Sequence, residues 1–402
     1  MTNENRNFTA FIWHAIFLAF ASSFIEINTV IPSLILKAGG SEVIIGLITA
    51  ISIGIPLLAQ LLFASILVTK PRKKPYLLLG IYLRIFSLAM ISFILFTNLP
   101  PKSIIIFTII GLTIFSFSGI FAGISYTDLL GKSILRKNLK KFMGTRQILR
   151  SIFALFGALT ARVVINKYNY PFNYSVMFFI ASFSLFMASI GFLVINEKKV
   201  NYVKKIPSFL SVLKSIPTIL TKDKNLLNYI IFSNLTGFGL IIIPFYMSLA
   251  KHSFSLNNQI IGNYLFSQMF GVVLASFFWK KILHNEGYKR VLKYCVVFGS
   301  FLPILSLISS KISPLLFSLV FVFSGITLSA RQMSFEGVLI EISSEENRAL
   351  YVGISGALNI VTAILPLLIG VVIKYVGFTF VFIFVSVILL FSLKCLKNLD
   401  IK

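Results

Sequence analysis

Residues 196–225 read NEKKVNYVKKIPSFLSVLKSIPTILTKDKN and divide the chain near its middle. This stretch carries seven lysines against Glu197 and Asp223, and it is the longest part of the chain without an apolar segment of membrane-spanning length. The sequence on each side is a series of long apolar segments. We therefore interpret 196–225 as a basic cytoplasmic linker between two membrane-embedded halves. Residues 207–217 within it are either a short amphipathic surface helix or part of a solvated loop.

The composition places the chain in a membrane. Of its 402 residues, 57% are hydrophobic and only 12% are charged, which is not typical of a soluble domain. A bilayer core is crossed by about 20 apolar residues in a helix, whereas barrel strands would show short alternating segments, which are absent. Twelve segments are long enough to cross: 9–36, 42–69, 76–98, 103–130, 142–166, 174–195, 226–250, 257–283, 290–309, 313–341, 351–374 and 377–396.

The net charge of +25 is distributed as in a membrane protein and not as in a nucleic-acid-binding protein. With both termini in the cytoplasm, 27 of the 37 lysines and arginines fall on the cytoplasmic side. Each outer loop carries a single lysine: Lys37, Lys102, Lys167, Lys251, Lys311 and Lys374. Cytoplasmic loops are enriched in Lys and Arg, so this asymmetry predicts the orientation. We expect a multi-pass protein of a bacterial inner membrane, with the lipid bilayer and no nucleic acid as partner.

The two halves resemble each other in sequence. Ile44-Ile45-Gly46 matches Ile260-Ile261-Gly262, and FSFSGI at 115–120 matches FVFSGI at 321–326. Pro32 falls near Pro244 in the same alignment. The order and near-constant spacing of these matches predict two six-helix bundles, 1–195 and 226–402, related by a pseudo-twofold axis. The predicted fold is all-α, with twelve transmembrane helices.

This arrangement resembles the major facilitator superfamily over the whole chain. The superfamily motif after the second helix, roughly G-x-x-x-D-R-x-G-R-R-K, retains only Arg72, Lys73 and Lys74, and its Asp is missing near Thr69. HNEGYKR at 284–290 repeats part of it in the second half. The segment NTVIPSLILKAGGSEVIIGLITA, followed by PRKKP, is also similar to a group of bacterial permeases. FALFGALTAR at 153–162 lacks the Gly-Pro signature of drug antiporters, which makes that subgroup less favoured.

Four segments carry polar residues at helical spacing, around Glu26, Gln60, Arg331 and Asn359. Polar groups at membrane depth are costly unless they face a cavity or a partner, although Ser and Thr also serve helix packing. The resemblance implies that these four segments face a central cavity. The candidate substrate and coupling residues are Glu26, Gln60, Arg162, Asn234, Gln268, Arg331 and Asn359.

Three of these candidates carry charge at membrane depth: Glu26, Arg162 and Arg331. Glu26 is a candidate proton carrier or a partner for a substrate amine, and the alternative is a static ion pair with Arg162. Arg331 suits a carboxylate or phosphate held by two hydrogen bonds, and the alternative is a structural ion pair.

The resemblance also implies a cytoplasmic gate. In the superfamily an acidic residue at the end of the fourth helix pairs with the basic loop, and Asp128 occupies that position here. Glu336 falls near the equivalent position in the second half. The predicted gating residues are Arg72, Lys73, Lys74, Asp128, Lys289, Arg290 and Glu336.

The resemblance therefore implies a secondary transporter that moves a small organic solute by alternating access, coupled to protons. We expect a monomer with no cofactor, no metal and no enzymatic activity. His14, His252 and His284 are scattered, and no nucleotide-binding loop is present. A polytopic acyl- or glycosyltransferase, a lipid flippase and a sensor on the same scaffold remain the alternatives.

Overall fold

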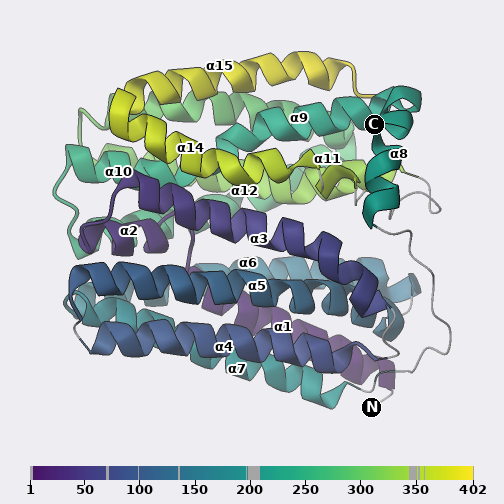
Figure 1. The fold of residues 1–402 in the computed structure, drawn as a ribbon, viewed down its shortest axis with the longest axis horizontal. Coiled ribbons are helices and arrows are strands. Elements are labelled where there is room, and N and C mark those ends of the chain that lie inside the picture. Colours follow the sequence, from purple (N-terminus) through teal and green to yellow (C-terminus); the bar gives the residue numbers. More distant parts are fainter. Residues whose placement is uncertain are drawn as a thin grey trace. The chain divides into compact units, whose positions relative to one another are not determined.

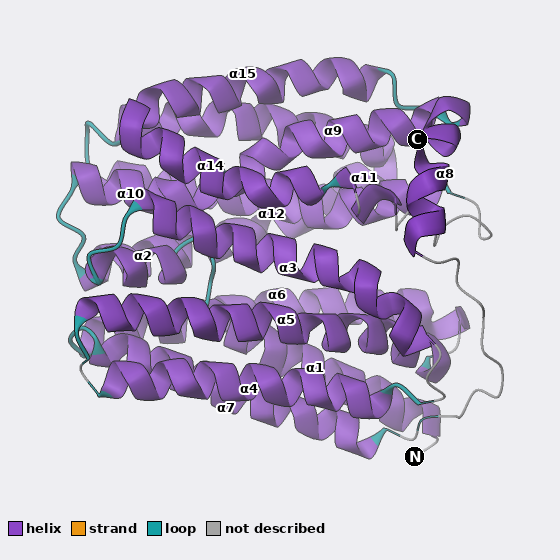
Figure 2. Cartoon of the chain, in the orientation of Figure 1, coloured by secondary structure: helices purple, strands orange, loops and turns teal. Residues whose placement is uncertain are grey.

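The computed structural model describes residues 3–68, 72–97, 99–134, 136–195, 197, 209–343, 351, 354–356 and 358–401. Every regular element in this part of the chain is a helix, and short turns join the helices (Figure 2). Apolar segments of this length form helices in a bilayer because a helix satisfies its own backbone hydrogen bonds. The predicted all-α membrane fold is confirmed.

The chain forms two compact units, and the first comprises residues 1–26, 37–39 and 51–206. Its helices are α1 (Asn3–Phe24), the later part of α3 (Glu42–Val68), α4 (Lys74–Phe96), α5 (Pro101–Ser133), α6 (Arg136–Lys167) and α7 (Phe172–Val194) (Figure 1). Helix α1 packs on α6 and α7, and α4 packs on α5 and α7. The buried hydroxyls of Ser92 and Ser175 each donate to the other residue's carbonyl, at 2.8 and 2.7 Å. Such bonds join helices where there is no water to compete.

The second unit comprises residues 27–36, 40–50 and 207–402. Its helices are α2 (Val30–Lys37), the first part of α3, α8 (Phe209–Lys222), α9 (Lys224–Ile241), α10 (Ile243–Ser253), α11 (Asn258–Ser309), α12 (Pro314–Glu341), α14 (Ile360–Val376) and α15 (Phe378–Lys397) (Figure 1). Helix α11 packs on α12 and α15, and α15 packs on α9. Residues 27–36 and 40–50, the predicted outer ends of the first two segments, are thus part of the second unit. The domain limits expected at 195 and 226 stay a prediction.

Apart from α8, the described helices follow the twelve predicted segments in order, and this is consistent with the predicted number of spans. In the part that the structure describes, nine helices are long and apolar enough to cross a membrane, and one of them, α11, contains two predicted segments. Two shorter apolar helices, Glu42–Leu57 and Thr362–Val376, lie in the second and eleventh segments.

The first and seventh segments differ from the prediction because each is broken. Residues 25–29 are non-helical between α1 and α2, and Ile242 interrupts the path from α9 to α10. Pro32 lies in the first turn of α2 and Pro244 in the first turn of α10, where proline is tolerated because its missing N–H has no helical partner. The two breaks fall at corresponding places in the repeat.

A single glycine separates the eighth and ninth segments within α11. Gly287 has φ 77° and ψ −178°, and α11 is helical on both sides of it. This backbone conformation is essentially restricted to glycine. The glycine of HNEGYKR therefore turns the chain between two spans.

The second half of the linker is largely helical. Helix α8 covers Phe209–Lys222, a longer range than the predicted 207–217. Its Ile216 is 7% exposed and belongs to a hydrophobic cluster with Leu226 and Tyr229 of α9. The described apolar residues of α8, Ile216, Ile219 and Leu220, therefore pack within the second unit.

Candidate functional site

Glu26 lies in the break between α1 and α2. It is half-buried, and the neighbouring side chains of Asn28 and Thr29 are 8% and 0% exposed. Non-helical backbone at membrane depth is tolerated only inside protein or beside a water-filled cavity. The break therefore places a carboxylate on non-helical backbone. This is the arrangement by which interrupted transporter helices bind ions and substrates.

Arg162 lies half-buried on α6, beside an open pocket of about 420 Å³. Val163 and Phe156, which line the same pocket, are 63% and 57% exposed. The guanidinium thus borders an apolar surface. The ion pair between Arg162 and Glu26 stays a prediction.

Arg331 lies inside the second unit, and the partners that the structure gives it are neutral. Its guanidinium donates to Thr236 Oγ1 at 2.8 Å and to the Ser233 carbonyl at 3.3 Å, both on α9. It also lies 3.9 Å from the ring centroid of Phe335. Among the described residues no carboxylate forms an ion pair with it. Hydrogen bonds and a cation–π contact hold the charge in place without neutralising it.

A small cavity adjoins Arg331. Its volume of about 20 Å³ has room for one water molecule, and residues of α9, α11, α12 and α15 line it. Thr236 and Thr327 supply hydroxyls to its wall, and Gly239 and Gly299 supply bare backbone. An organic solute cannot enter this cavity unless the surrounding helices move.

The three predicted amides in the second unit are incompletely bonded. Asn234 donates to the Ile230 carbonyl at 2.9 Å, and Asn359 donates to Ser355 Oγ at 3.4 Å. Within the described chain their Oδ1 atoms accept no hydrogen bond, and neither polar atom of the fully buried Gln268 amide has a partner. Buried amides normally find partners, so these atoms are suited to water or a polar solute. The side chain of Gln60 lies outside the described residues.

The basic loop before α4 is held by the start of the linker. The Lys73 and Lys74 backbone N–H groups donate to Glu197 Oε1 and Oε2 at 2.7 and 2.9 Å. Lys74 Nζ donates to the Leu193 and Ile195 carbonyls, each at 2.8 Å. Glu197, which follows α7, thus caps the N-terminus of α4. Lys74, the first residue of α4, caps the C-terminus of α7.

The other predicted gating residues are only partly described. Arg72 is exposed, and the side chains of Asp128 and Glu336 lie outside the described residues. Lys289 Nζ donates to the Lys397 and Leu399 carbonyls at 3.2 and 2.8 Å. Arg290 Nε donates to Glu286 Oε2 at 2.6 Å. The structure therefore gives Lys289 and Arg290 partners within the second unit.

The first unit contains two further half-buried cations that the list of candidate residues left aside. Arg84 lies 4.9 Å from the ring centroid of Phe115, and its Nε is buried without a partner in the described chain. Arg146 donates to the Tyr126 hydroxyl at 3.1 Å. As with Arg331, the groups that hold these guanidinium groups are neutral. For Arg84 the signal in the sequence was an arginine inside an apolar segment.

A polar cluster at the predicted outer end of the second unit was not predicted. Glu42, the first residue of α3, accepts hydrogen bonds at Oε1 from Ser248 Oγ at 2.6 Å and from His252 Nε2 at 3.0 Å. The side chain of Glu42 is 12% exposed and that of His252 is 60% exposed. Lys251 Nζ donates to the Leu36 carbonyl at 2.7 Å. Side chains of α10 therefore bind the ends of α2 and α3.

Helices α3 and α14 touch directly beside this cluster. A Cβ on Gly46 would lie 2.3 Å from the Pro366 carbonyl oxygen, and a Cβ on Gly370 would lie 2.5 Å from the Glu42 carbonyl oxygen. Only glycine fits at such distances because the opposing atoms are backbone. We refer to Glu42, Ser248, His252, Gly46 and Gly370 together as the outer contact.

Residues 227–397 match the sequence model of the Major Facilitator Superfamily. No curated protein matches the chain by sequence. The matched residues run from the start of α9 to the end of α15.

Solved structures match nearly the whole chain. A D-xylose–proton symporter has a TM-score of 0.71 at 11% identity, with 98% of each chain covered. The nucleoside transporter NupG has a TM-score of 0.69 at 15% identity, with 99% of each chain covered. The human organic anion transporter MFSD10 (TETRAN) has a TM-score of 0.66 at 15% identity, covering 98% of this chain and 100% of its own. Identities this low establish the fold alone.

The matched superfamily and these structural neighbours are membrane transporters and not enzymes. The predicted resemblance is confirmed: the chain has the fold of the major facilitator transporters, and residues 227–397 carry the sequence signature of that superfamily.

Proposed function

We propose that the chain is a secondary active transporter of a small organic solute that carries an anionic group. The observation that carries the proposal is Arg331, a guanidinium inside a membrane unit that the described residues leave without a counter-charge. A fixed positive charge in a low-dielectric site attracts a carboxylate or phosphate strongly. Arg84 and Arg146 add positive charge in the first unit.

The polar atoms for the rest of the solute come from the amides of the second unit. Asn234, Gln268 and Asn359 offer donors and acceptors that the described residues do not use. Because the cavity beside Arg331 holds only one water molecule, the solute reaches the guanidinium after α9 or α12 moves. Such a movement belongs to alternating access, in which a central site opens to each side in turn.

Coupling is assigned to Glu26. A carboxylate at membrane depth is neutral, paired or solvated, because an unpaired charge there is costly. A carboxylate that is neutral in one step of transport and ionised in another carries a proton. An anion accompanied by one proton crosses without net charge, so this assignment and the charge of Arg331 fit together.

The anion requirement is tested with purified protein in sealed vesicles. Exchange of labelled carboxylates and sugar phosphates is compared with that of their amide or dephosphorylated analogues. We expect the anions to be preferred. Arg331→Gln should weaken their binding roughly ten- to hundredfold, the value of a hydrogen bond to a charged group. Arg331→Lys should recover part of the loss, and Lys311→Gln, an exposed charge at the outer end, should behave as wild type.

Two results would count against this function. Equal exchange of anions and neutral analogues by wild type and Arg331→Gln would make Arg331 a structural group only. A protein that binds solutes in detergent but moves none across a vesicle membrane would be a sensor.

The outer contact is assigned to closure of the predicted outer side. Glu42 accepts hydrogen bonds from Ser248 and His252 of α10, and these bonds hold α10 against the start of α3. The other charged groups at this end are Lys37, Lys251 and Lys374.

Glu42→Ala removes the acceptor of both bonds and should therefore weaken outer closure about fivefold, the usual value of a hydrogen bond. Glu42→Gln keeps an acceptor for Ser248 and should lose less. The reactivity of a cysteine introduced at Ser41 reports the closure. Equal reactivity in the wild type and both variants would exclude these bonds as a support of closure.

A further inference from the structure

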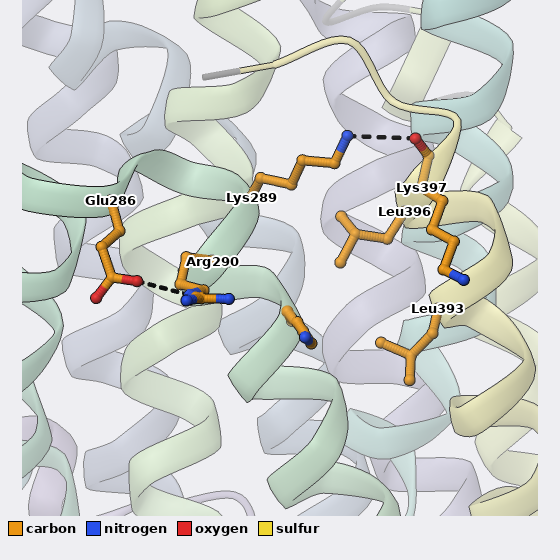
Figure 3. A pocket seen from close by; sticks show the side chains of 7 residues that line it. Glu286, Lys289, Arg290, Leu393, Leu396 and Lys397 are labelled. Carbon is orange, nitrogen blue, oxygen red and sulfur yellow. Dashed lines mark hydrogen bonds and ion pairs between the residues drawn. The ribbon is translucent and has the colours of Figure 1, made fainter.

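A second binding region lies at the Gly287 turn of α11 and the predicted cytoplasmic end of α15, and it includes the predicted gating residues Lys289 and Arg290. A pocket of about 530 Å³ opens there. Figure 3 shows its lining, which combines four cationic side chains with one carboxylate and two leucines: Lys289, Arg290, Lys293, Lys397, Glu286, Leu393 and Leu396. The pocket is therefore both basic and apolar.

Two of the four cations have roles within the protein. Lys289 Nζ donates to the Lys397 carbonyl (Figure 3) and also to the Leu399 carbonyl, which holds the chain after α15. Arg290 forms the 2.6 Å bond to Glu286. The ammonium groups of Lys293 and Lys397 donate no hydrogen bond to any residue that the structure describes. These two are available to an external anion.

The surface of α11 continues from the pocket as an apolar stripe. Val297 and Phe301 follow Lys293 at steps of four residues, so the three lie on one helical face. Val297 is 42% exposed and Phe301 is 51% exposed. On α15, Leu390 and Val387 are 51% and 59% exposed. Exposed apolar faces of spanning helices lie in hydrocarbon, and α11 packs against α15.

The arrangement matches an amphiphile whose charged end is negative. A phosphate at the pocket would lie between two free ammonium groups, and an acyl chain would follow the stripe from Leu393 toward Val297 and Phe301. A soluble phosphate would use the cations but gain nothing from the leucines. Basic pockets between helices on the cytoplasmic side suit the headgroups of anionic lipids.

We propose that this pocket binds an anionic phospholipid, with Lys293 and Lys397 on the phosphate and the α11–α15 surface against an acyl chain. The site takes a lipid of the surrounding bilayer and no transported solute. This proposal is therefore independent of the function proposed above, and a negative result for one leaves the other unaffected.

The test uses the purified full-length chain in a neutral detergent. Dioleoylphosphatidylglycerol and dioleoylphosphatidylcholine are titrated separately, and bound lipid is counted by native mass spectrometry. We expect phosphatidylglycerol to be retained in preference to phosphatidylcholine. Each basic side chain near an anionic membrane surface changes affinity roughly fivefold. The double variant Lys293→Gln/Lys397→Gln should therefore bind phosphatidylglycerol roughly 25- to 30-fold more weakly.

The matched control is Lys280→Gln/Lys281→Gln, which removes two exposed lysines from the same helix outside the pocket. It should bind as the wild type does. Leu393→Glu provides a second probe because it places a carboxylate in the pocket wall while both lysines remain, and it should also weaken binding. Melting temperatures show whether each variant is folded.

Three outcomes would overturn the proposal. Equal losses in the two double variants would mean that any cytoplasmic lysine pair attracts the lipid. Equal retention of the two lipids by the wild type would remove the charge requirement. Displacement of the lipid by glycerol phosphate at equal concentration would make the pocket a site for soluble phosphates.

Discussion

Glu26→Gln is expected to abolish proton-driven accumulation of the solute while exchange of solute across the membrane continues. Glutamine imitates the protonated carboxylate and cannot release a proton. With one proton per solute and the membrane potential held at zero, a gradient of one pH unit supports roughly tenfold accumulation. The variant should stop at equal concentrations on the two sides. Uptake into vesicles with an imposed pH gradient measures this directly.

The alternative role of Glu26 gives a different result. If Glu26 only neutralises Arg162, the single change leaves a half-buried charge unpaired and should lower the melting temperature. Adding Arg162→Gln should then restore the melting temperature. Normal accumulation by a stable Glu26→Gln protein would exclude both roles and leave Asp128 and Glu336 as the candidate coupling acids.

Gly46→Ala is expected to separate α3 from α14 and weaken the outer contact. The added Cβ would lie 2.3 Å from the Pro366 carbonyl oxygen, and backbone cannot move aside as a side chain can. Overpacking of this kind costs about 1–3 kcal/mol, so closure should weaken roughly five- to 150-fold. Spin labels at residues 41 and 374 should report longer distances in the variant.

Gly299→Ala is the matched control for this experiment. It adds the same methyl group inside the second unit, but the nearest atom, Leu389 Cδ1, is 3.8 Å away, an ordinary contact distance. We expect its distance distribution and melting temperature to match those of the wild type. Unchanged distances in Gly46→Ala would mean that closure does not depend on contact between α3 and α14.

The helices were predictable because each membrane helix is encoded by one continuous stretch of sequence. An apolar run of about 20 residues identifies a membrane helix almost by itself. The breaks at residues 25–29 and at Ile242 were not predicted, although Pro32 and Pro244 marked both places. A proline is compatible with the first turn of a new helix and also with a kink in a continuous helix. Packing around the proline decides between the two.

The candidate site was predictable in position and not in its contacts. The polar spacing identified Arg331, but its partners on α9 lie more than 90 residues away in the chain. Glu42 and His252 are 210 residues apart, and each alone is an ordinary charged group at a helix end. Pairings of this kind depend on how helices pack, which single residues do not encode. The roles of Asp128, Glu336 and Gln60 stay predictions.

The turn at Gly287 determines whether the chain crosses the membrane an even or an odd number of times. Without it, α11 would be one straight helix of 52 residues, roughly 78 Å long, more than twice the thickness of a hydrocarbon core. The part of the helix longer than the hydrocarbon core would protrude into water. Every later segment would then enter the bilayer from the opposite face. A crossing number of twelve returns the C-terminus to the side of the N-terminus, whereas eleven does not. The sidedness of the last four predicted spans, and of the basic residues that follow them, therefore depends on one residue that has no side chain.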